Sequence, residues 1–132
     1  MISFHFVPLN EATPEDVKNL KMGARRAKLT EAEVLRMLIS GEAMLWRAEG
    51  PDCTGVVLVQ ELETDGVKEL NIPLMAGKAS LKYKEHMQKT LEEFGRLRGV
   101  KRITAEESKA VYRLVGKPLG YKIDKYMISK EL

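Results

Sequence analysis

The sequence predicts an α/β domain in which helices pack on one mixed β-sheet. Segments with strand-like and helix-like patterns follow one another in the order β-α-α-β-β-β-α-β-α-β, with three consecutive strands in the middle. The 132 residues are enough for one domain with its own core and too few for two typical ones. With 44% hydrophobic and 31% charged residues, the composition is that of a globular protein. We therefore expect residues 1–132 to form a single domain.

The N-terminal third is predicted to contain one strand and two helices. Apolar residues alternate over residues 2–6, as in a strand with one buried face. Thr13 and Pro14 are typical of a helix cap and of the first helical residue. Thr30 and Glu33 have the spacing of a capping box, which predicts the start of a second, shorter helix.

Three strands are predicted in the middle of the chain. Residues 44–48 form the first of these, and a Gly-Pro-Asp cluster turns the chain into the second. Residues 55–62 are rich in β-branched side chains, as in a central strand, and an Asp-Gly pair then reverses the chain. Residues 67–74 alternate between apolar and polar side chains. The middle of the chain is thus predicted to be a meander.

The third of these strands contains a proline near its end. Leu70, Ile72 and Leu74 are expected to share one face, because side chains of a strand alternate. Pro73 has no N–H group to donate to a neighbouring strand. It therefore predicts either a bulge or a loss of pairing at this point.

The C-terminal half is predicted to begin with the longest helix, over residues 80–98. A short strand over 101–105, a short helix over 108–115 and a last strand over 121–128 follow it. This prediction places six strands in the chain, with the sixth close to the C-terminus.

The charge is unevenly distributed along the chain. The net charge is +3, but residues 1–66 sum to −4 and residues 67–132 to +7, with eight basic and three acidic residues over 78–102. Such a basic half indicates a nucleic acid or a phosphate-rich cofactor, or is simply a solvated helix face. Nucleic acid is the weaker interpretation, because few aromatic side chains in this stretch could stack on bases. One cysteine, no apolar run of membrane-spanning length and no secretory leader indicate a cytoplasmic protein.

The segment from Glu69 to Lys84 is the one in which chemistry is expected. A strand loses its pairing at a proline and is followed by a Gly/Ala loop and a basic helix start. Free N–H groups at a helix start favour anions, and small residues let a phosphate approach the backbone. Lys78, Lys82 and Lys84 could then pair with phosphates, although an ordinary tight connection would have the same composition.

The order of elements resembles the GNAT acyl-CoA-dependent N-acyltransferases over nearly the whole chain. In that family a Gln/Arg-x-x-Gly-x-Gly/Ala loop after the fourth strand holds the pyrophosphate of acetyl-CoA. The motif can be placed in two registers. Residues 74–79 keep both small positions but have Leu in place of Gln/Arg. Residues 76–81, which follow a proline common in the family, lack both the Gln/Arg and the last small residue. The resemblance implies acetyl-CoA or another acyl-CoA as cosubstrate. The residues it places at the cofactor are Leu74, Met75, Ala76, Gly77, Lys78, Ala79 and Lys82.

The resemblance also implies two catalytic residues. Glu69 is the best-placed carboxylate to act as the base that deprotonates an acceptor amine, with Glu61 and Glu63 behind it; a solvated strand face is the alternative. Tyr112 has the spacing to Gly116 of the family tyrosine that reprotonates the CoA thiolate, although Lys117 replaces the expected Phe. Packing against the sheet is the alternative for Tyr112.

Two functions follow from the resemblance. The first is acyl transfer to an amine acceptor that contacts the first two helices, near the basic run at 25–28. The second is a catalytically degenerate GNAT-fold protein, of a bacteriophage or prophage type, that acts in binding or assembly. Family members run to a seventh strand, whereas the prediction here ends after the sixth, so a second copy of the chain could complete the sheet as a homodimer.

Overall fold

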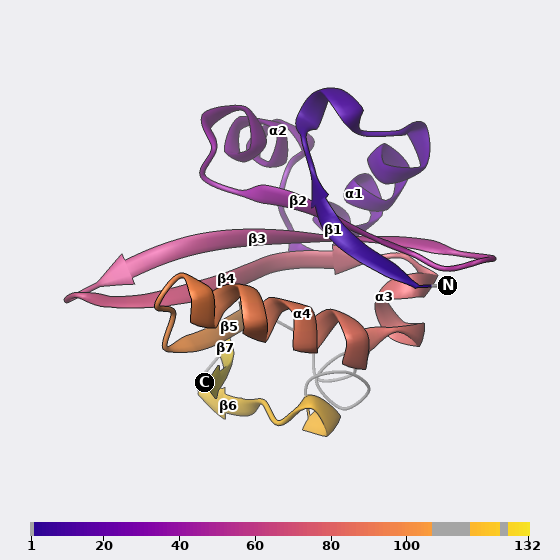
Figure 1. The fold of residues 1–132 in the computed structure, drawn as a ribbon. Helices are drawn as coiled ribbons and strands as arrows, with labels where there is room; N and C mark the ends of the chain where they lie inside the picture. Colours follow the sequence, from indigo (N-terminus) through magenta and orange to yellow (C-terminus); the bar gives the residue numbers. More distant parts are fainter. Residues whose placement is uncertain (1, 107–116, 125–126) are drawn as a thin grey trace.

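A computed structural model describes residues 2–106, 117–124 and 127–132 (Figure 1). The helix predicted over 108–115, which contains Tyr112, lies outside the described residues. The α-helices are α1 (Pro14–Ala27), α2 (Glu31–Ser40), α3 (Lys78–Lys82) and α4 (Lys84–Leu97), and the short 3-10 helices are η1 (Leu9–Glu11) and η3 (Lys117–Leu119). The strands are β1 (Ser3–Val7), β2 (Met44–Glu49), β3 (Thr54–Thr64), β4 (Val67–Ala76), β5 (Arg102–Glu106), β6 (Lys122–Asp124) and β7 (Met127–Glu131).

All strands of the described chain belong to one seven-stranded sheet in the order β1-β2-β3-β4-β5-β7-β6. The pair β4–β5 is parallel and the other neighbouring strands are antiparallel, so the predicted mixed sheet is confirmed. Helices α1 and α2 lie on one face of the sheet and α3 and α4 on the other (Figure 1). Each face has its own apolar cluster, one including Leu20 and Ala24 of α1 and the other Met87 and Leu91 of α4.

Both predicted helix starts on the first face are confirmed. Thr13 accepts a hydrogen bond from the N–H of Asp16, whose carboxylate accepts one from the N–H of Thr13. Thr30 and Glu33 make the same reciprocal pair at the start of α2. These capping boxes satisfy donors that a helix start otherwise leaves free, which is why sequence spacing alone locates them.

The predicted helix over 80–98 is two helices that meet at Tyr83. Tyr83 has a φ of −114° and a ψ of 28°, which depart from helical geometry and separate α3 from α4. At the end of α4, Leu97 is 89% exposed, whereas Val100, beyond the helix, is buried. Among the described residues, every helix is too short or too polar to span a bilayer.

The single strand predicted over 121–128 is also wrong. Residues 122–124 and 127–131 form two strands that pair antiparallel with each other, and β7 pairs in turn with β5. The described sheet therefore has the seventh strand that the sequence analysis did not find. Each arm is short and alternates by itself, so the pattern over the two arms together resembles that of one strand.

Candidate functional site

The described pairing between β4 and β5 ends near the middle of β4, at a position that we call the parting point. The described pairing between β4 and β5 covers Glu69↔Arg102 to Ile72↔Ala105. Among the described residues, the part of β4 that follows Ile72 pairs with β3 alone. Because alternate residues of an antiparallel strand direct their N–H and C=O groups away from the partner, this part of β4 presents backbone groups toward the side opposite β3. Such an edge can bind an extended ligand through main-chain hydrogen bonds.

A bulge at Pro73 accompanies the parting of the strands. Leu58 of β3 pairs with Leu74, but Gln60 pairs with Asn71, so one residue of β3 lies opposite Ile72 and Pro73 together. This confirms the bulge predicted from the proline, which cannot donate to a ladder.

The bulge changes which face the following side chains occupy. Leu70 and Ile72 lie in the cluster under α4, whereas Leu74 and Ala76 lie in the cluster under α1. The prediction that Leu74 shares a face with Leu70 and Ile72 is therefore wrong, because the extra residue shifts the alternation by one.

A loop at Gly77 follows the parted segment and leads into α3. Gly77 has φ 98° and ψ 156°, a conformation that is essentially restricted to glycine. A Cβ atom there would lie 2.6 Å from the Cα atom of Gly55 and 2.6 Å from the carbonyl oxygen of Thr54. Glycine is thus required by the close approach of β3, whether or not a phosphate also approaches.

The structure separates the predicted cofactor residues into buried and exposed ones. Leu74, Ala76 and Ala79 are at most 4% exposed, so their side chains belong to the core and only their backbone could meet a ligand. Lys78 is exposed, and Lys82 is exposed but lies 3.4 Å from the carboxylate of Asp52. The remaining members, Met75 and Gly77, are partly buried.

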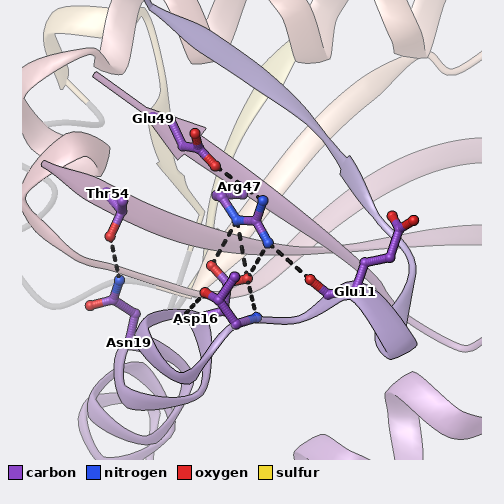
Figure 2. A network of polar contacts seen from close by, with 7 residues as sticks. Glu11, Asp16, Asn19, Arg47, Glu49 and Thr54 are labelled. Atoms are coloured by element: carbon purple, nitrogen blue, oxygen red, sulfur yellow. Dashed lines mark hydrogen bonds and ion pairs between the residues drawn. The ribbon is translucent and has the colours of Figure 1, made fainter. Parts of the chain in front are cut away.

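A hollow of about 290 Å³ lies beside the Gly77 loop on the side of α1. Its cationic lining residues are Lys78 and Lys18 of α1. Asn19 and Thr54 also line it, and the amide of Asn19 donates to the hydroxyl of Thr54 at 3.4 Å (Figure 2). This hollow brings two cations together with the carboxylates of Glu15 and Asp52 at one end of β4.

A row of polar side chains crosses the sheet just before the parting point. The hydroxyl of Thr104 donates to Oδ1 of Asn71 at 3.0 Å, and the amide of Asn71 donates to Oε1 of Gln60 at 3.0 Å. Because Asn71 lies between Leu70 and Ile72, the row faces the α1 side of the sheet. The sequence analysis missed these residues, and the signal available was a polar residue between two buried apolar ones.

Glu69 lies on the same face, two residues further from the parting point. Its carboxylate accepts a hydrogen bond from Nε of Arg102 at 3.1 Å, and its side chain is 13% exposed. Glu61 pairs with Leu70 in the sheet and forms an ion pair with Arg98 at 2.8 Å, which places it on the opposite face. Of the carboxylates on β3 and β4 singled out from the sequence, Glu69 is the one that lies beside the polar row.

An ion pair between Asp16 and Arg47 attaches the N-terminal end of α1 to β2. Asp16 is fully buried and accepts hydrogen bonds from the guanidinium of Arg47, which also contacts Glu49 and the backbone carbonyl of Glu11 (Figure 2). Burial acts to raise the pKa of Asp16, but the hydrogen bonds from Arg47 and Thr13 outweigh it, so its pKa lies below the ordinary value. The pair fixes the helix against β2.

Solved structures of other proteins resemble the chain in fold. No protein-family model and no curated protein sequence matches it. A probable acetyltransferase from Staphylococcus epidermidis is similar over 99% of both chains, with a TM-score of 0.71 and 8% identity. An aminoglycoside acetyltransferase from an uncultured soil metagenomic sample is similar over 94% of this chain and 93% of its own, with a TM-score of 0.65 and 19% identity. A GNAT family acetyltransferase from Brucella melitensis, in complex with acetyl-CoA, is similar over 100% and 88%, with a TM-score of 0.61 and 12% identity.

Proposed function

We propose that this chain, which has the fold of the GNAT acetyltransferases, is an N-acyltransferase that moves an acyl group from acyl-CoA to an amine acceptor. The observation that carries the proposal is the end of the described β4–β5 pairing at Ile72 and Ala105, shortly before the Gly77 loop. The pantetheine arm of CoA is extended and has amide groups, so it suits the backbone edge of residues 73–76. The acetyl-CoA bound to the Brucella protein supports the choice of cosubstrate.

In the proposed reaction, the amine nitrogen attacks the thioester carbonyl carbon, and the bond from that carbon to sulfur breaks. Glu69 takes the proton of the amine through water, and Tyr112 protonates the departing CoA thiolate. Both roles are proposed from the sequence, and Glu69 lies on β4 three residues before Ile72, where the described pairing with β5 ends. Most of the rate would come from holding the two reactants together.

The polar row is proposed to orient the acceptor. Asn71 and Thr104 already bond to each other, which leaves the amide group of Gln60 and the lone pairs of the Thr104 hydroxyl for further hydrogen bonds. A donor and an acceptor in fixed positions could hold an amine-bearing substrate on the α1 side of the sheet. The acceptor would then approach the thioester from the face opposite α4.

Binding without catalysis is the second candidate function. The position where the family has Gln or Arg is Leu74 or Ala76, depending on the register of the loop motif, and both side chains are buried in the core under α1. Glu69 is held by Arg102. These two observations favour a GNAT-fold protein that binds a partner and has lost acyl transfer.

Titration with CoA and acetyl-CoA tests the cosubstrate. Ligand at a hundred times its dissociation constant is expected to stabilise the protein by about 2.7 kcal/mol, which raises the melting temperature by several degrees. Lys78→Ala is expected to weaken CoA binding about fivefold, since its cation lines the loop. Lys89→Ala, an equal charge change on the exposed side of α4, is the control. No shift at millimolar CoA would contradict acyl-CoA binding.

Glu69→Gln tests the proposed base. Once CoA binding is established, we expect kcat with an accepted amine to fall about a hundredfold while KM for acyl-CoA is unchanged, because a base acts in the chemical step. Glu63→Gln, an exposed carboxylate on the same hairpin, should leave kcat within about twofold. Equal values for Glu69→Gln and the unmodified protein would remove Glu69 from the mechanism.

A further inference from the structure

The outward face of α1 carries a row of cations. Lys18, Lys21 and Arg25 are exposed and fall within an arc of about 60° around the helix axis, given 3.6 residues per turn. Lys28, which caps the helix, extends the row to a length of about 15 Å. The ion pairs found among the described residues involve none of these side chains.

Two hollows connect this row to the Gly77 loop. One, of about 430 Å³, is lined by Lys18, Lys21, Met22 and Arg25 among others. The hollow at the Gly77 loop shares Lys18 and Met22 with it and adds Lys78. Glu15 also lines the second hollow, as does Asp52, whose carboxylate is paired with Lys82. The cationic row therefore continues from α1 onto the start of α3.

The fold holds α1 with these cations outward. On its inner face Leu20 and Ala24 are buried against the sheet. A Cβ atom at Gly23 would lie 2.9 Å from Cδ1 of Leu74, so the helix backbone sits close to β4. The Asp16–Arg47 pair fixes its first turn (Figure 2). The spacing of the cations is thus set by a helix that is attached along its length.

We propose that this cationic face of α1, extended by Lys78, binds the phosphate backbone of a double-stranded nucleic acid. A duplex carries phosphates at regular intervals along each strand, so a straight row of cations about 15 Å long can contact several of them. The hollows along the row contain no aromatic side chain among their described lining residues, so single strands would lack the stacking that they usually require. Contacts of this kind carry no sequence preference.

The basic stretch at 78–102, which has few aromatic side chains, does not favour nucleic acid. In the structure much of that charge is neutralised, since Arg96, Arg98 and Arg102 pair with Glu92, Glu61 and Glu69. The cations on α1 belong to the acidic half of the chain, and folding brings them together on one face. The proposal concerns this surface and does not depend on acyl transfer.

Fluorescence anisotropy with a labelled duplex of about 20 base pairs, as DNA and as RNA, tests the proposal over a range of salt concentrations. For the unmodified protein, the affinity should fall with salt with a log–log slope of about −3 to −4, as four phosphate contacts predict. The variant Lys18→Ala/Lys21→Ala/Arg25→Ala should bind at least about tenfold more weakly at low salt. The magnitude of its log–log slope should be smaller by about two to three.

A matched variant separates the row from net charge. Lys68→Ala/Lys89→Ala/Lys101→Ala removes the same charge from exposed positions elsewhere and should bind within about twofold of the unmodified protein. Circular dichroism and thermal melting confirm that both variants are folded. Equal weakening by both variants, or binding that is insensitive to salt, would overturn the proposal. Equally tight binding of polyglutamate through the same residues would overturn it in favour of an acidic protein.

Discussion

Asp16→Asn is expected to lower the free energy of unfolding by about 3 kcal/mol. The change keeps the size of the side chain and an oxygen that can cap α1, but it leaves Arg47 without its buried partner carboxylate. Arg47 is itself largely buried, with 13% of its side chain exposed, so its charge cannot turn fully into water. Urea denaturation followed by circular dichroism measures the loss.

The exposed pair between Arg36 and Glu42 provides the comparison. Its partners are 62% and 51% exposed, so Glu42→Gln should change the free energy of unfolding by less than about 0.5 kcal/mol. Replacing both buried partners, as Asp16→Leu with Arg47→Met, should recover much of the loss because no unpaired charge remains. A cost for Asp16→Asn as small as that of Glu42→Gln would show that water reaches the pair.

The Asp16–Arg47 pair makes the stability of the protein depend on pH under acidic conditions. Because the pKa of Asp16 is lower in the folded than in the unfolded chain, its contribution is fully present above the unfolded value of about 3.9 and is lost as the pH falls through the folded value. Glu92, whose pKa is also lowered, adds to this loss of stability at low pH through its hydrogen bond from Lys130. In Asp16→Asn the loss of stability below about pH 4 should therefore be smaller but not absent.

Gly77→Ala is expected to cost about 3 kcal/mol of unfolding free energy. Two effects combine: the backbone conformation at Gly77 is strained for any residue with a Cβ atom, and that atom would overlap the backbone of Gly55 and Thr54. Neither neighbour can turn away, because both atoms belong to the main chain of β3. Urea denaturation measures the cost.

Gly41 allows the two effects to be separated. It ends α2 with φ 79° and would place a Cβ atom in open space, with nothing within 4 Å. Gly41→Ala therefore measures conformational strain alone and should cost about 1 kcal/mol. If Gly41→Ala and Gly77→Ala cost the same, the overlap with β3 does not contribute, and the loop can move away from the strand.

The parts of the fold that were predictable from sequence are those fixed by neighbours in the chain. Both capping boxes and the bulge at Pro73 depend on residues within a few positions of each other, and the structure confirms them. The order of strands and helices was sufficient for the mixed sheet. Local chemistry determines these features, so it can be read from local sequence.

The features that were missed depend on contacts between distant segments. The buried pair of Asp16 and Arg47 joins α1 to β2, and the polar row joins Gln60, Asn71 and Thr104 across three strands. No spacing in the sequence indicates which polar residues meet in this way. The break at Tyr83 was missed for the same reason, since its side chain packs over Gly50, far away in the chain.

The Gly77 loop is already ordered by the protein around it. The hydroxyl of Ser80 donates to the carbonyl of Ala76 at 2.9 Å, the N–H of Ser80 bonds to the carbonyl of Gly77, and β3 packs directly on Gly77. The conformational entropy of this loop is therefore given up when the chain folds rather than when a ligand arrives. A ligand at the loop would find its backbone donors preorganised, so its affinity would depend on its own flexibility more than on that of the protein.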